Sequence, residues 1–304
     1  MSKPRRPKRK ITGILLLDKP LGCSSNQALL RVRSLYQAEK AGHTGSLDPL
    51  ATGLLPICLG QATKLCGYLL DSDKRYLATA KLGEKTRTGD AEGEVIAHSD
   101  ATTVTQAKLE TILPKFLGTI QQVPPMYSAL KQDGLRLYTL AREGIEVVRE
   151  PREVTIHALN LVNFSQGQFQ LDVRCSKGTY IRTLAEDIAA ALGQCAHLVA
   201  LRRVEVSPFS QPRMVTLDEL EEAAKQGLPT LDGLLNPTLA AFAHWPQVTV
   251  DEQQAHSLLR GQAVRIPHVL DTEWFAVKDS AGQMLCIAQM DPNGALAPKR
   301  WLGE

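Results

Sequence analysis

One acidic residue lies in a loop whose composition suits catalysis. The segment 42–53 has the sequence GHTGSLDPLATG and places Asp48 between Leu47 and Pro49. Its glycines make the backbone permissive, and Pro49 favours an extended backbone at Asp48. Apolar neighbours raise the pKa of a carboxyl group unless a cation lies beside it. The segment therefore predicts either a reactive carboxylate or an Asp-Pro turn, and spacing alone favours the turn.

The same segment resembles a signature of the bacterial tRNA pseudouridine synthase B family, G-H-T-G-x-L-D-P-x-A-T-G. Four other motifs of that family occur in matching order and spacing. Residues 18–25 resemble D-K-P-x-G-x-S/T-S, residues 74–76 K-x-Y, residues 123–129 V-P-P-x-Y/F-S-A, and residues 175–182 C-S-x-G-T-Y-I-R. The resemblance is strong over residues 11–210 and weak over 247–304. Arg87 departs from it, because family members often carry an acid there, and should affect the approach of RNA rather than the chemistry.

The resemblance implies a reaction on RNA. A uridine in the T-loop of tRNA, at position 55, loses its N-glycosidic bond, the base turns, and C5 is joined to C1′. Such an isomerisation has no redox step and no net hydrolysis, so no cofactor and no metal is expected. Asp48 is implied as the nucleophile, through attack at C1′, attack at C6, or action as a base toward the sugar, and the sequence leaves these routes open.

The resemblance also implies catalytic partners for Asp48. Arg182 matches the position that pairs with the nucleophile, and we expect it to hold the pKa of Asp48 near or below the usual value of about 3.9. Tyr76 matches the platform on which the flipped base stacks, which is worth about 1–3 kcal/mol. Its phenol is also a candidate acceptor of the C5 proton. Read alone, Arg182 would be an exposed helix arginine and Tyr76 a core tyrosine.

Substrate binding is expected from further matched positions. His43 would fill the space that the flipped base leaves, and Tyr180 and Leu201 would pack against the uracil. Phosphate contacts, which position RNA without reading its sequence, are expected from Lys19, Arg75, Lys131, Arg142, Lys177, Arg202 and Arg203. The expected partner is the T-loop and T-stem of tRNA, recognised by shape and unpaired bases, and the chain is expected to act as a monomer.

Hydrophobic periodicity predicts an α+β fold with a mixed, largely antiparallel sheet and flanking helices. The resemblance identifies this as the pseudouridine synthase fold. The clearest strand is 168–176, in which apolar and polar residues alternate strictly, and 154–164 is its expected hairpin partner. Strands at 75–82 and 94–98 are interpreted as a second hairpin with a long loop. Other strands are expected at 13–17, 54–59 and 197–206, and helices at 26–37, 105–116, 180–192 and 217–225.

The length of 304 residues suggests about two domains. Residues 1–10 hold six basic residues and no acid, and we interpret them as a basic flexible tail. Residues 11–245 form the expected catalytic domain. Residues 246–304 form a small β-rich domain with strands near Val248, Val264, 274–278 and 285–290. The resemblance makes this a PUA-like RNA-contacting domain, although a module that only caps the fold is an equal alternative.

Composition excludes several classes of protein. Removing the six charges of the tail from the net charge of +3 leaves the remaining residues at −3, so the fold is not a basic block. The six cysteines form no C-x-x-C pair, which fits reduced thiols in the cytoplasm. No segment approaches the ~18 apolar residues of a membrane helix, and Asp18 ends the apolar run at 11–17 too early for a signal peptide.

Two other functions compete with the isomerase. An RNA-binding chaperone that folds tRNA without essential catalysis would not need Asp48. A glycosidase would need two carboxylates, and no second acid is expected near the Asp48 motif. The presence of Asp48, Tyr76 and Arg182 together favours the isomerase.

Overall fold

The computed structural model describes residues 8–132, 134–266 and 274–302. Its main body is an eight-stranded sheet in the order β1-β3-β12-β4-β11-β10-β7, with β2 paired to β3 off this path. The strands are β1 (Gly13–Lys19), β2 (Ala41–His43), β3 (Ala51–Leu59), β4 (Lys74–Leu82), β7 (Gly118–Gln122), β10 (Arg152–Ser165), β11 (Gln168–Cys175) and β12 (Ala196–Val206). Only β3 and β12 pair in parallel, so the predicted mixed, largely antiparallel sheet is confirmed.

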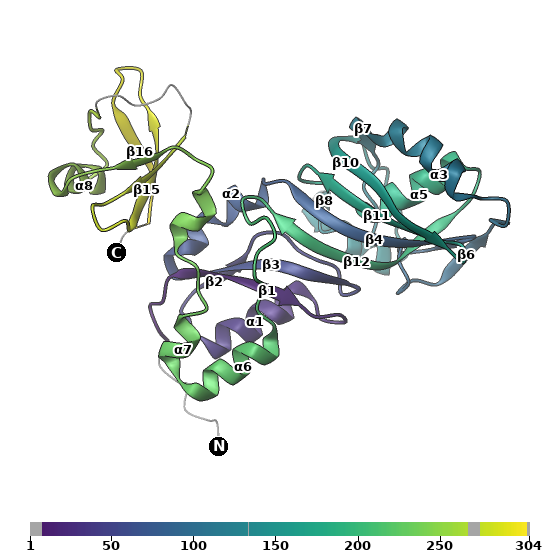
Figure 1. Ribbon diagram of the computed structural model, residues 1–304, viewed down its shortest axis with the longest axis horizontal. Coiled ribbons are helices and arrows are strands. Elements are labelled where there is room, and N and C mark those ends of the chain that lie inside the picture. The colour runs from purple at the N-terminus through teal and green to yellow at the C-terminus, as the bar shows by residue number, and fades with distance from the viewer. Residues whose placement is uncertain (1–7, 133, 267–273, 303–304) are drawn as a thin grey trace.

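Helices cover this sheet in two separate places (Figure 1). One group lies beside β1 and β3 and consists of α1 (Ser25–Leu35), α6 (Leu217–Gln226) and α7 (Leu228–Asp232). The other lies beside β10 and β11 and consists of α3 (Gln106–Ile112), η2 (Leu113–Phe116) and α5 (Ile181–Ala191). Shorter pieces are η1 (Gly60–Leu65), α2 (Cys66–Leu70), α4 (Leu137–Arg142) and η3 (Thr238–Phe242). The sheet thus has two covered halves, which meet where β12 runs between β3 and β4. Within the described ranges, no helix combines the length and apolar content needed to cross a membrane.

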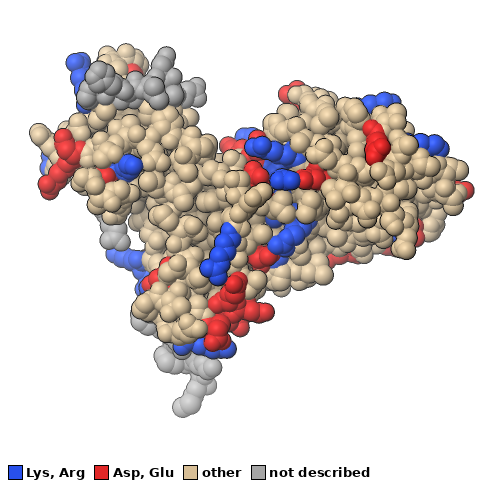
Figure 2. Space-filling model, in the orientation of Figure 1, with Lys and Arg blue, Asp and Glu red and all other residues tan. Residues whose placement is uncertain are grey.

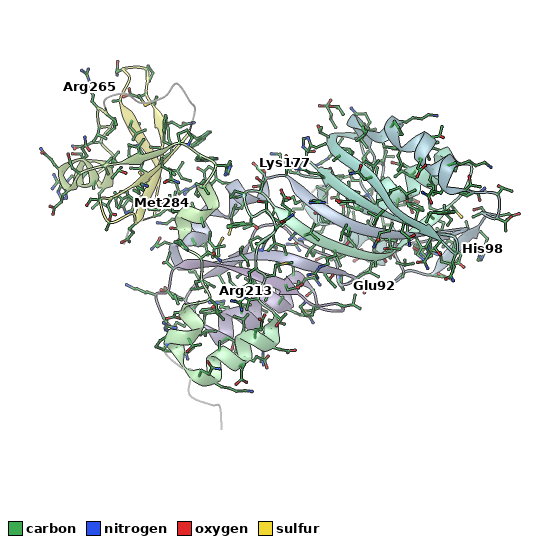
Figure 3. The ribbon with its side chains drawn as sticks, in the orientation of Figure 1. Glu92, His98, Lys177, Arg213, Arg265 and Met284 are labelled. Atoms are coloured by element: carbon green, nitrogen blue, oxygen red, sulfur yellow. The ribbon has the colours of Figure 1, made fainter. Side chains whose placement is uncertain are left out.

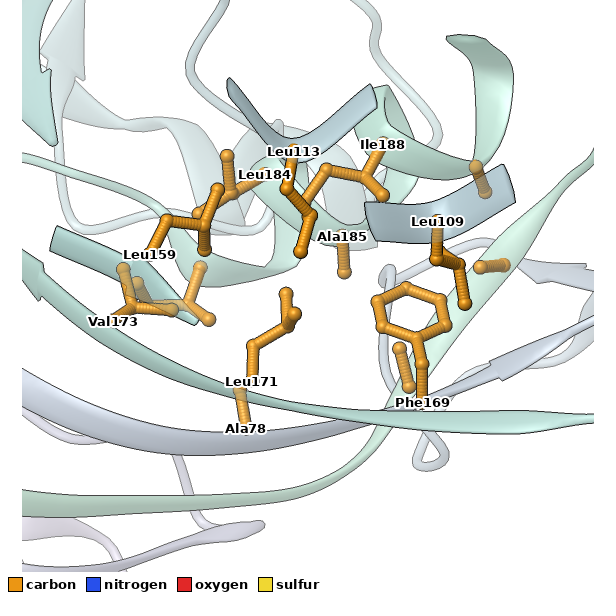
Figure 4. Packing of buried hydrophobic residues seen from close by; sticks show 14 of the residues in the cluster. Ala78, Leu109, Leu113, Leu159, Phe169, Leu171, Val173, Leu184, Ala185 and Ile188 are labelled. Atoms are coloured by element: carbon orange, nitrogen blue, oxygen red, sulfur yellow. The ribbon is translucent and has the colours of Figure 1, made fainter. Parts of the chain in front are cut away.

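The alternation seen in the sequence of β11 fixes the core of the second half. Phe169, Leu171 and Val173 are buried and face α5, where Leu184 and Ile188 complete the cluster (Figure 4). Burying a side chain of this size contributes about 1.5–3 kcal/mol. This packing holds α5 against the sheet and thereby places its first residues, which belong to the site described below.

One predicted hairpin is confirmed and one is wrong. β10 and β11 pair antiparallel around a turn in which Gln166 and Gly167 have φ values of 51° and 73°. The strand predicted at 94–98 does not pair with β4, because β11 and β12 already occupy both edges of β4. It forms β6 (Val95–His98), which pairs with β5 (Glu84–Thr86) in a small separate ribbon. A third ribbon joins β8 (Lys131–Gln132) to β9 (Leu135–Arg136).

Gly53 marks the closest approach of β3 to β12. Its φ is +97°, and a Cβ added there would lie 2.2 Å from the carbonyl oxygen of Arg203. We expect Gly53→Ala to lower the free energy of unfolding by about 3 kcal/mol, since the backbone must shift as well as accept a strained φ. The matched control is Gly193→Ala, where φ is +71° but nothing lies within 4 Å, and where about 1 kcal/mol is expected. Urea unfolding checks both, and equal losses would contradict the steric explanation.

The C-terminal part is a four-stranded sheet in the order β13-β14-β15-β16. Its strands are β13 (Gln247–Thr249), β14 (Phe275–Lys278), β15 (Met284–Met290) and β16 (Leu296–Trp301), and α8 (Glu252–Leu259) packs beside them. The strand predicted near Val264 is wrong, because Val264 makes only an isolated bridge to Leu296. β16 was missed because Pro298, Lys299 and Arg300 interrupt its apolar pattern.

A shared apolar core joins the small sheet to the main body. Trp245 packs on Phe242 and Trp274 with ring-centroid distances of 4.6 and 5.8 Å, and Tyr68 of α2 packs on Trp274 at 5.6 Å. Met284, labelled in Figure 3 beside this junction, belongs to the same cluster. The C-terminal sheet is therefore packed against the body rather than tethered by a bare linker.

The predicted flexible tail is partly corrected. Residues 1–7 lie outside the described residues, but Arg9 is held in place. Its guanidinium donates to Asp232 of α7 at 3.0 Å, its N–H donates to the carbonyl of Gln37, and its carbonyl accepts from Glu39. Arg9 therefore fastens the chain to the end of α1 and to α7, so flexibility through residue 10 is wrong.

Candidate active site

A cavity of about 200 Å³ lies between the two halves of the sheet. Five of the predicted site residues line it: Asp48, Tyr76, Tyr180, Arg182 and Leu201. They come from the loop between β2 and β3, from β4, from the start of α5 and from β12. Residues that are distant in the sequence therefore meet in one small polar and apolar pocket.

The carboxylate of Asp48 is paired with a fixed guanidinium. Nη2 of Arg182 lies 3.0 Å from Oδ2 of Asp48. Arg182 is only 6% exposed and donates to two backbone carbonyls, those of Thr88 at 2.6 Å and Tyr127 at 2.7 Å. These two bonds hold the guanidinium in place, so the ion pair defines where the carboxylate points.

A second carboxylate shares this arginine. Asp90 is buried, and its Oδ2 lies 3.8 Å from Nη1 of Arg182. It is held in turn by the hydroxyl of Thr88 at 2.6 Å and the N–H of Glu92 at 3.1 Å. The expectation that no second acid lies near Asp48 is therefore wrong. From the sequence, this loop drew attention only through Arg87, and nothing in the pattern marked Asp90 as buried.

The pKa of Asp48 lies above its usual value. Loss of solvation in the cavity is the largest cause, and the charge of Asp90 adds to it, while Arg182 and Lys19 act in the opposite direction. The side chain keeps 43% of its surface accessible, and Asp48 lines the cavity. The expectation that Arg182 would hold this pKa near or below the usual value is wrong, because the loss of solvation outweighs the attraction of Arg182 and the charge of Asp90 adds to it.

Lys19 does not offer its ammonium group to RNA. The residue is fully buried, and Nζ donates to the backbone carbonyls of Pro20 and Cys23, with a longer contact of 3.5 Å to that of Pro49. Burial lowers the pKa of Lys19. The predicted contact of Lys19 with substrate is therefore wrong. Lys19 instead connects the turn at residues 20–23 to the loop that contains Asp48.

Arg203 is corrected in the same way. It is 1% exposed, and its guanidinium donates to the carbonyls of Leu54 at 2.7 Å and Gly45 at 3.0 Å. One of these carbonyls belongs to the Asp48 loop and the other to β3, which follows it. Because Arg203 is buried while it donates to both, its guanidinium cannot reach a phosphate. The sequence could not reveal this burial, because an arginine on a strand is usually exposed.

The other predicted phosphate contacts remain at the surface. Arg75 pairs with Asp172, Arg202 with Asp18, and Lys177 with Asp71, while Lys131 and Arg142 are exposed. Figure 2 shows a group of basic side chains mixed with acidic ones near the middle of the visible face, where Figure 3 places Lys177. Arg75, Arg202 and Lys177 would exchange one ionic partner for another on binding RNA, whereas no ion pair of the described residues involves Lys131 or Arg142.

His43 lies outside the cavity. It ends β2, opposite Ile57 of β3, and its Nδ1 is buried without a hydrogen-bond partner among the described residues. Burial and the charge of Arg203 both lower its pKa. The structure therefore does not place His43 in the wall of this cavity, and its filling of the space left by the flipped base stays a prediction.

The remaining walls come from well-fixed elements. Tyr76 lies within β4 between Val173 of β11 and Arg203 of β12. Tyr180 precedes α5, and the amide of Gln122 both accepts from its N–H at 3.0 Å and donates to its carbonyl at 3.3 Å. Gln122, which is 1% exposed, thus sets the start of α5 and was missed by the sequence analysis.

Comparisons with known proteins show the family to which this chain belongs. Three family models match along the chain: TruB family pseudouridylate synthase (N terminal domain) at residues 33–181, tRNA pseudouridylate synthase B C-terminal domain at 182–243, and Pseudouridine synthase II TruB, C-terminal at 246–302. A tRNA pseudouridine synthase B from Pseudomonas aeruginosa (strain UCBPP-PA14) is 50% identical over 301 residues, covering 99% of both chains. This chain belongs to the TruB family of pseudouridine synthases.

Further relatives of this TruB-family chain support the same assignment. A tRNA pseudouridine synthase B from Methylobacillus flagellatus (strain ATCC 51484 / DSM 6875 / VKM B-1610 / KT) is 51% identical over 300 residues, which cover 99% of this chain and 98% of the relative. A chain in the crystal structure of a Cbf5-Nop10-Gar1 complex matches with a TM-score of 0.76 over 96% of this chain and 85% of that one, at 24% identity. That likeness extends to the fold alone and confirms the predicted fold class. In the part of this TruB-family chain that the structure describes, no group of three or more His, Cys, Asp or Glu residues is placed to hold a metal ion.

Proposed function

We propose that this chain converts uridine to pseudouridine at position 55 in the T-loop of tRNA, with Asp48 as the nucleophile. The observation that carries the proposal is the Asp48 carboxylate, 3.0 Å from a buried arginine, in a cavity walled by Tyr76 and Leu201. We propose residues 11–245 as the catalytic domain and a monomer as the active form. The reaction belongs in the cytoplasm, where tRNA is modified in bacteria.

The cavity requires the target nucleotide to leave the RNA stack. Base flipping costs a few kcal/mol, and stacking on an aromatic ring returns about 1–3 kcal/mol. Tyr76, Tyr180 and Leu201 line the cavity, and their side chains are suited to pack against a flat base. A base bound there meets Asp48, whose carboxylate can attack C1′ or C6 or act as a base toward the sugar.

Tyr76 is also a candidate acceptor of the C5 proton, because it lines the same cavity as Asp48. Burial raises the pKa of its phenol, while nearby Arg203 lowers it. Burial therefore disfavours the phenolate that would accept the proton, and the charge of Arg203 favours it. Stacking is the role that the position of Tyr76 supports without any change of protonation.

The reaction is tested by tritium release from a tRNA transcript labelled at C5 of its uridines. We expect the amount of tritium released to equal the amount of pseudouridine formed at position 55. A transcript that carries cytidine at position 55 should release no tritium from that position. Tight binding of the transcript without release would contradict the isomerase. That outcome would favour the alternative, an RNA-binding tRNA-folding chaperone without essential catalysis.

Ser128 is a polar residue in the cavity wall that could turn toward the base. Its hydroxyl is buried behind the cavity surface, has no hydrogen-bond partner of good geometry among the described residues, and lies close enough to the phenol of Tyr180 to lower the pKa of that group. We expect the polar edge of uracil to pair with it, so Ser128→Ala should lower kcat/KM about tenfold, mainly by raising KM, as for the loss of one hydrogen bond. Steady-state kinetics check this, with Ser165→Ala at the exposed end of β10 as the control. Equal kinetics for both variants would remove Ser128 from recognition.

We propose that residues 246–304 form a PUA-like domain that contacts RNA outside the cavity. Arg265, Lys299 and Arg300 are exposed on this part of the chain, and Figure 3 places Arg265 at its outer end. Such side chains suit phosphates. The shared aromatic core described above would keep them at a fixed distance from the cavity.

A further inference from the structure

Ser25 reaches from the first helix to the residue before the nucleophile. Its hydroxyl donates to the carbonyl of Leu47 at 3.0 Å and accepts from the N–H of the same residue at 2.7 Å. Ser25 is 4% exposed and Leu47 is 6% exposed, so both bonds are shielded from water. One side chain therefore satisfies both backbone polar groups of the residue that precedes Asp48.

The other side of Asp48 is held by the turn that precedes α1, because the N–H of Gly22 donates to the carbonyl of Pro49 at 2.9 Å. Within the Asp48 loop, the N–H of Ala51 donates to the carbonyl of Asp48 at 3.0 Å. The residues on both sides of the nucleophile are thus bonded to Gly22 and Ser25, at the start of α1. An aspartate has only two side-chain torsions, so fixing its backbone largely fixes the reach of its carboxylate.

We propose that Ser25 is a positioning residue that sets Asp48 at its 3.0 Å distance from Arg182. The inference rests on the proposed function, because it assigns Ser25 to the same nucleophile. Without the hydroxyl, the N–H and carbonyl of Leu47 would be buried without partners, and the loop would move to recover hydrogen bonds. A displacement of about 1 Å at a reacting group can reduce a rate about a hundredfold.

The neighbouring serine separates this role from helix stability. Ser24 is the N-cap of α1: its hydroxyl accepts from the N–H of Gln27, and the side chain of Gln27 accepts from the N–H of Ser24. Ser24 makes no hydrogen bond to the Asp48 loop among those of the described residues. Ser24→Ala therefore weakens the same helix by about 1 kcal/mol while leaving the contact between Ser25 and Leu47 intact.

The test compares Ser25→Ala, Ser25→Cys and Ser24→Ala in single-turnover tritium release with saturating tRNA transcript. We expect Ser25→Ala to slow the reaction about 10- to 100-fold, while the Kd for the transcript changes less than about twofold, since no RNA contact is removed. The acidic limb of its rate–pH profile should also lie at a higher pH than in the wild type. Asp48 would move away from the Arg182 cation that lowers its pKa, so the carboxyl group would become protonated at a higher pH. Ser24→Ala should retain the wild-type rate and pH profile.

Ser25→Cys has a side chain of similar shape but a weaker hydrogen-bond donor, so its rate should fall less than that of Ser25→Ala. Ser25→Cys takes the place of Ser25→Ala in the test if Ser25→Ala does not fold. A wild-type rate and pH profile in the folded Ser25 variants would overturn the inference, as would an equal loss in Ser24→Ala. Both results presuppose that the wild type releases tritium. If it does not, the proposed function fails, and the two failures are thereby distinguished.

Discussion

Asp48→Asn is expected to reduce tritium release by at least about a thousandfold, as for loss of a catalytic nucleophile. Asparagine keeps the shape of the side chain but supplies neither a negative charge nor an attacking carboxylate. Each proposed route, attack at C1′, attack at C6 or action as a base, loses its reacting group. The measurement is single-turnover release with enzyme in excess, which separates chemistry from product release.

The same variant should still bind RNA and fold. A carboxyl group whose pKa is higher in the folded than in the unfolded state lowers the free energy of unfolding when it is ionised. This destabilisation is complete at pH values above the folded-state pKa and disappears at pH values below the unfolded-state pKa. Because the pKa of Asp48 is raised, Asp48→Asn should not lower Tm at neutral pH. Arg182 keeps its bonds to Thr88 and Tyr127 and its neighbour Asp90. Turnover near the wild-type rate would refute the nucleophile, and loss of RNA binding would indicate a damaged loop instead.

Much of the fold follows from local patterns. The alternation in β11 predicted both the strand and its buried face, because a strand with one face on a core must alternate. The helices predicted at 26–37 and 105–116 begin within one residue of those positions, and their N-caps are Ser24 and Thr105. The pairing of β6 could not be predicted in this way, since it depends on β11 and β12 occupying the edges of β4. The local sequence pattern therefore predicts where a strand lies, but which strands pair with it depends on the arrangement of the whole sheet.

The site was predictable in its residue types but not in its electrostatics. Asp48, Tyr76 and Arg182 were named from motifs, and they line one cavity. Lys19 and Arg203 were expected at phosphates from their place in the family pattern, yet both are buried and donate to carbonyls in or beside the Asp48 loop. Burial of a charged side chain depends on contacts that are distant in the sequence, so composition and spacing do not report it. The raised pKa of Asp48 was missed for the same reason.

Because Arg182 lies between the carboxylates of Asp48 and Asp90, substitutions of Arg182 and Asp90 should shift the pKa of Asp48 in opposite directions. Arg182 lowers the pKa of Asp48 and Asp90 raises it. Removing the positive charge in Arg182→Gln should therefore raise that pKa and move the acidic limb of kcat/KM to higher pH, with a rate loss of about 10²–10³ at neutral pH. Asp90→Asn should move the limb to lower pH, because the repelling charge is gone while the amide oxygen can still accept from Thr88 and Glu92.

These shifts separate an electrostatic role for Arg182 from a purely structural one. Breaking a buried ion pair can cost about 3–5 kcal/mol of stability, so each variant is first checked for cooperative unfolding, and rates are compared only below the onset of unfolding. Arg75→Gln is the matched control, since Arg75 makes a two-bonded pair with Asp172 elsewhere on the same sheet. It should leave the acidic limb in place even if it weakens RNA binding. A limb that moves in the same direction for Arg182→Gln and Asp90→Asn would mean that disrupted packing, rather than charge at Asp48, controls the profile.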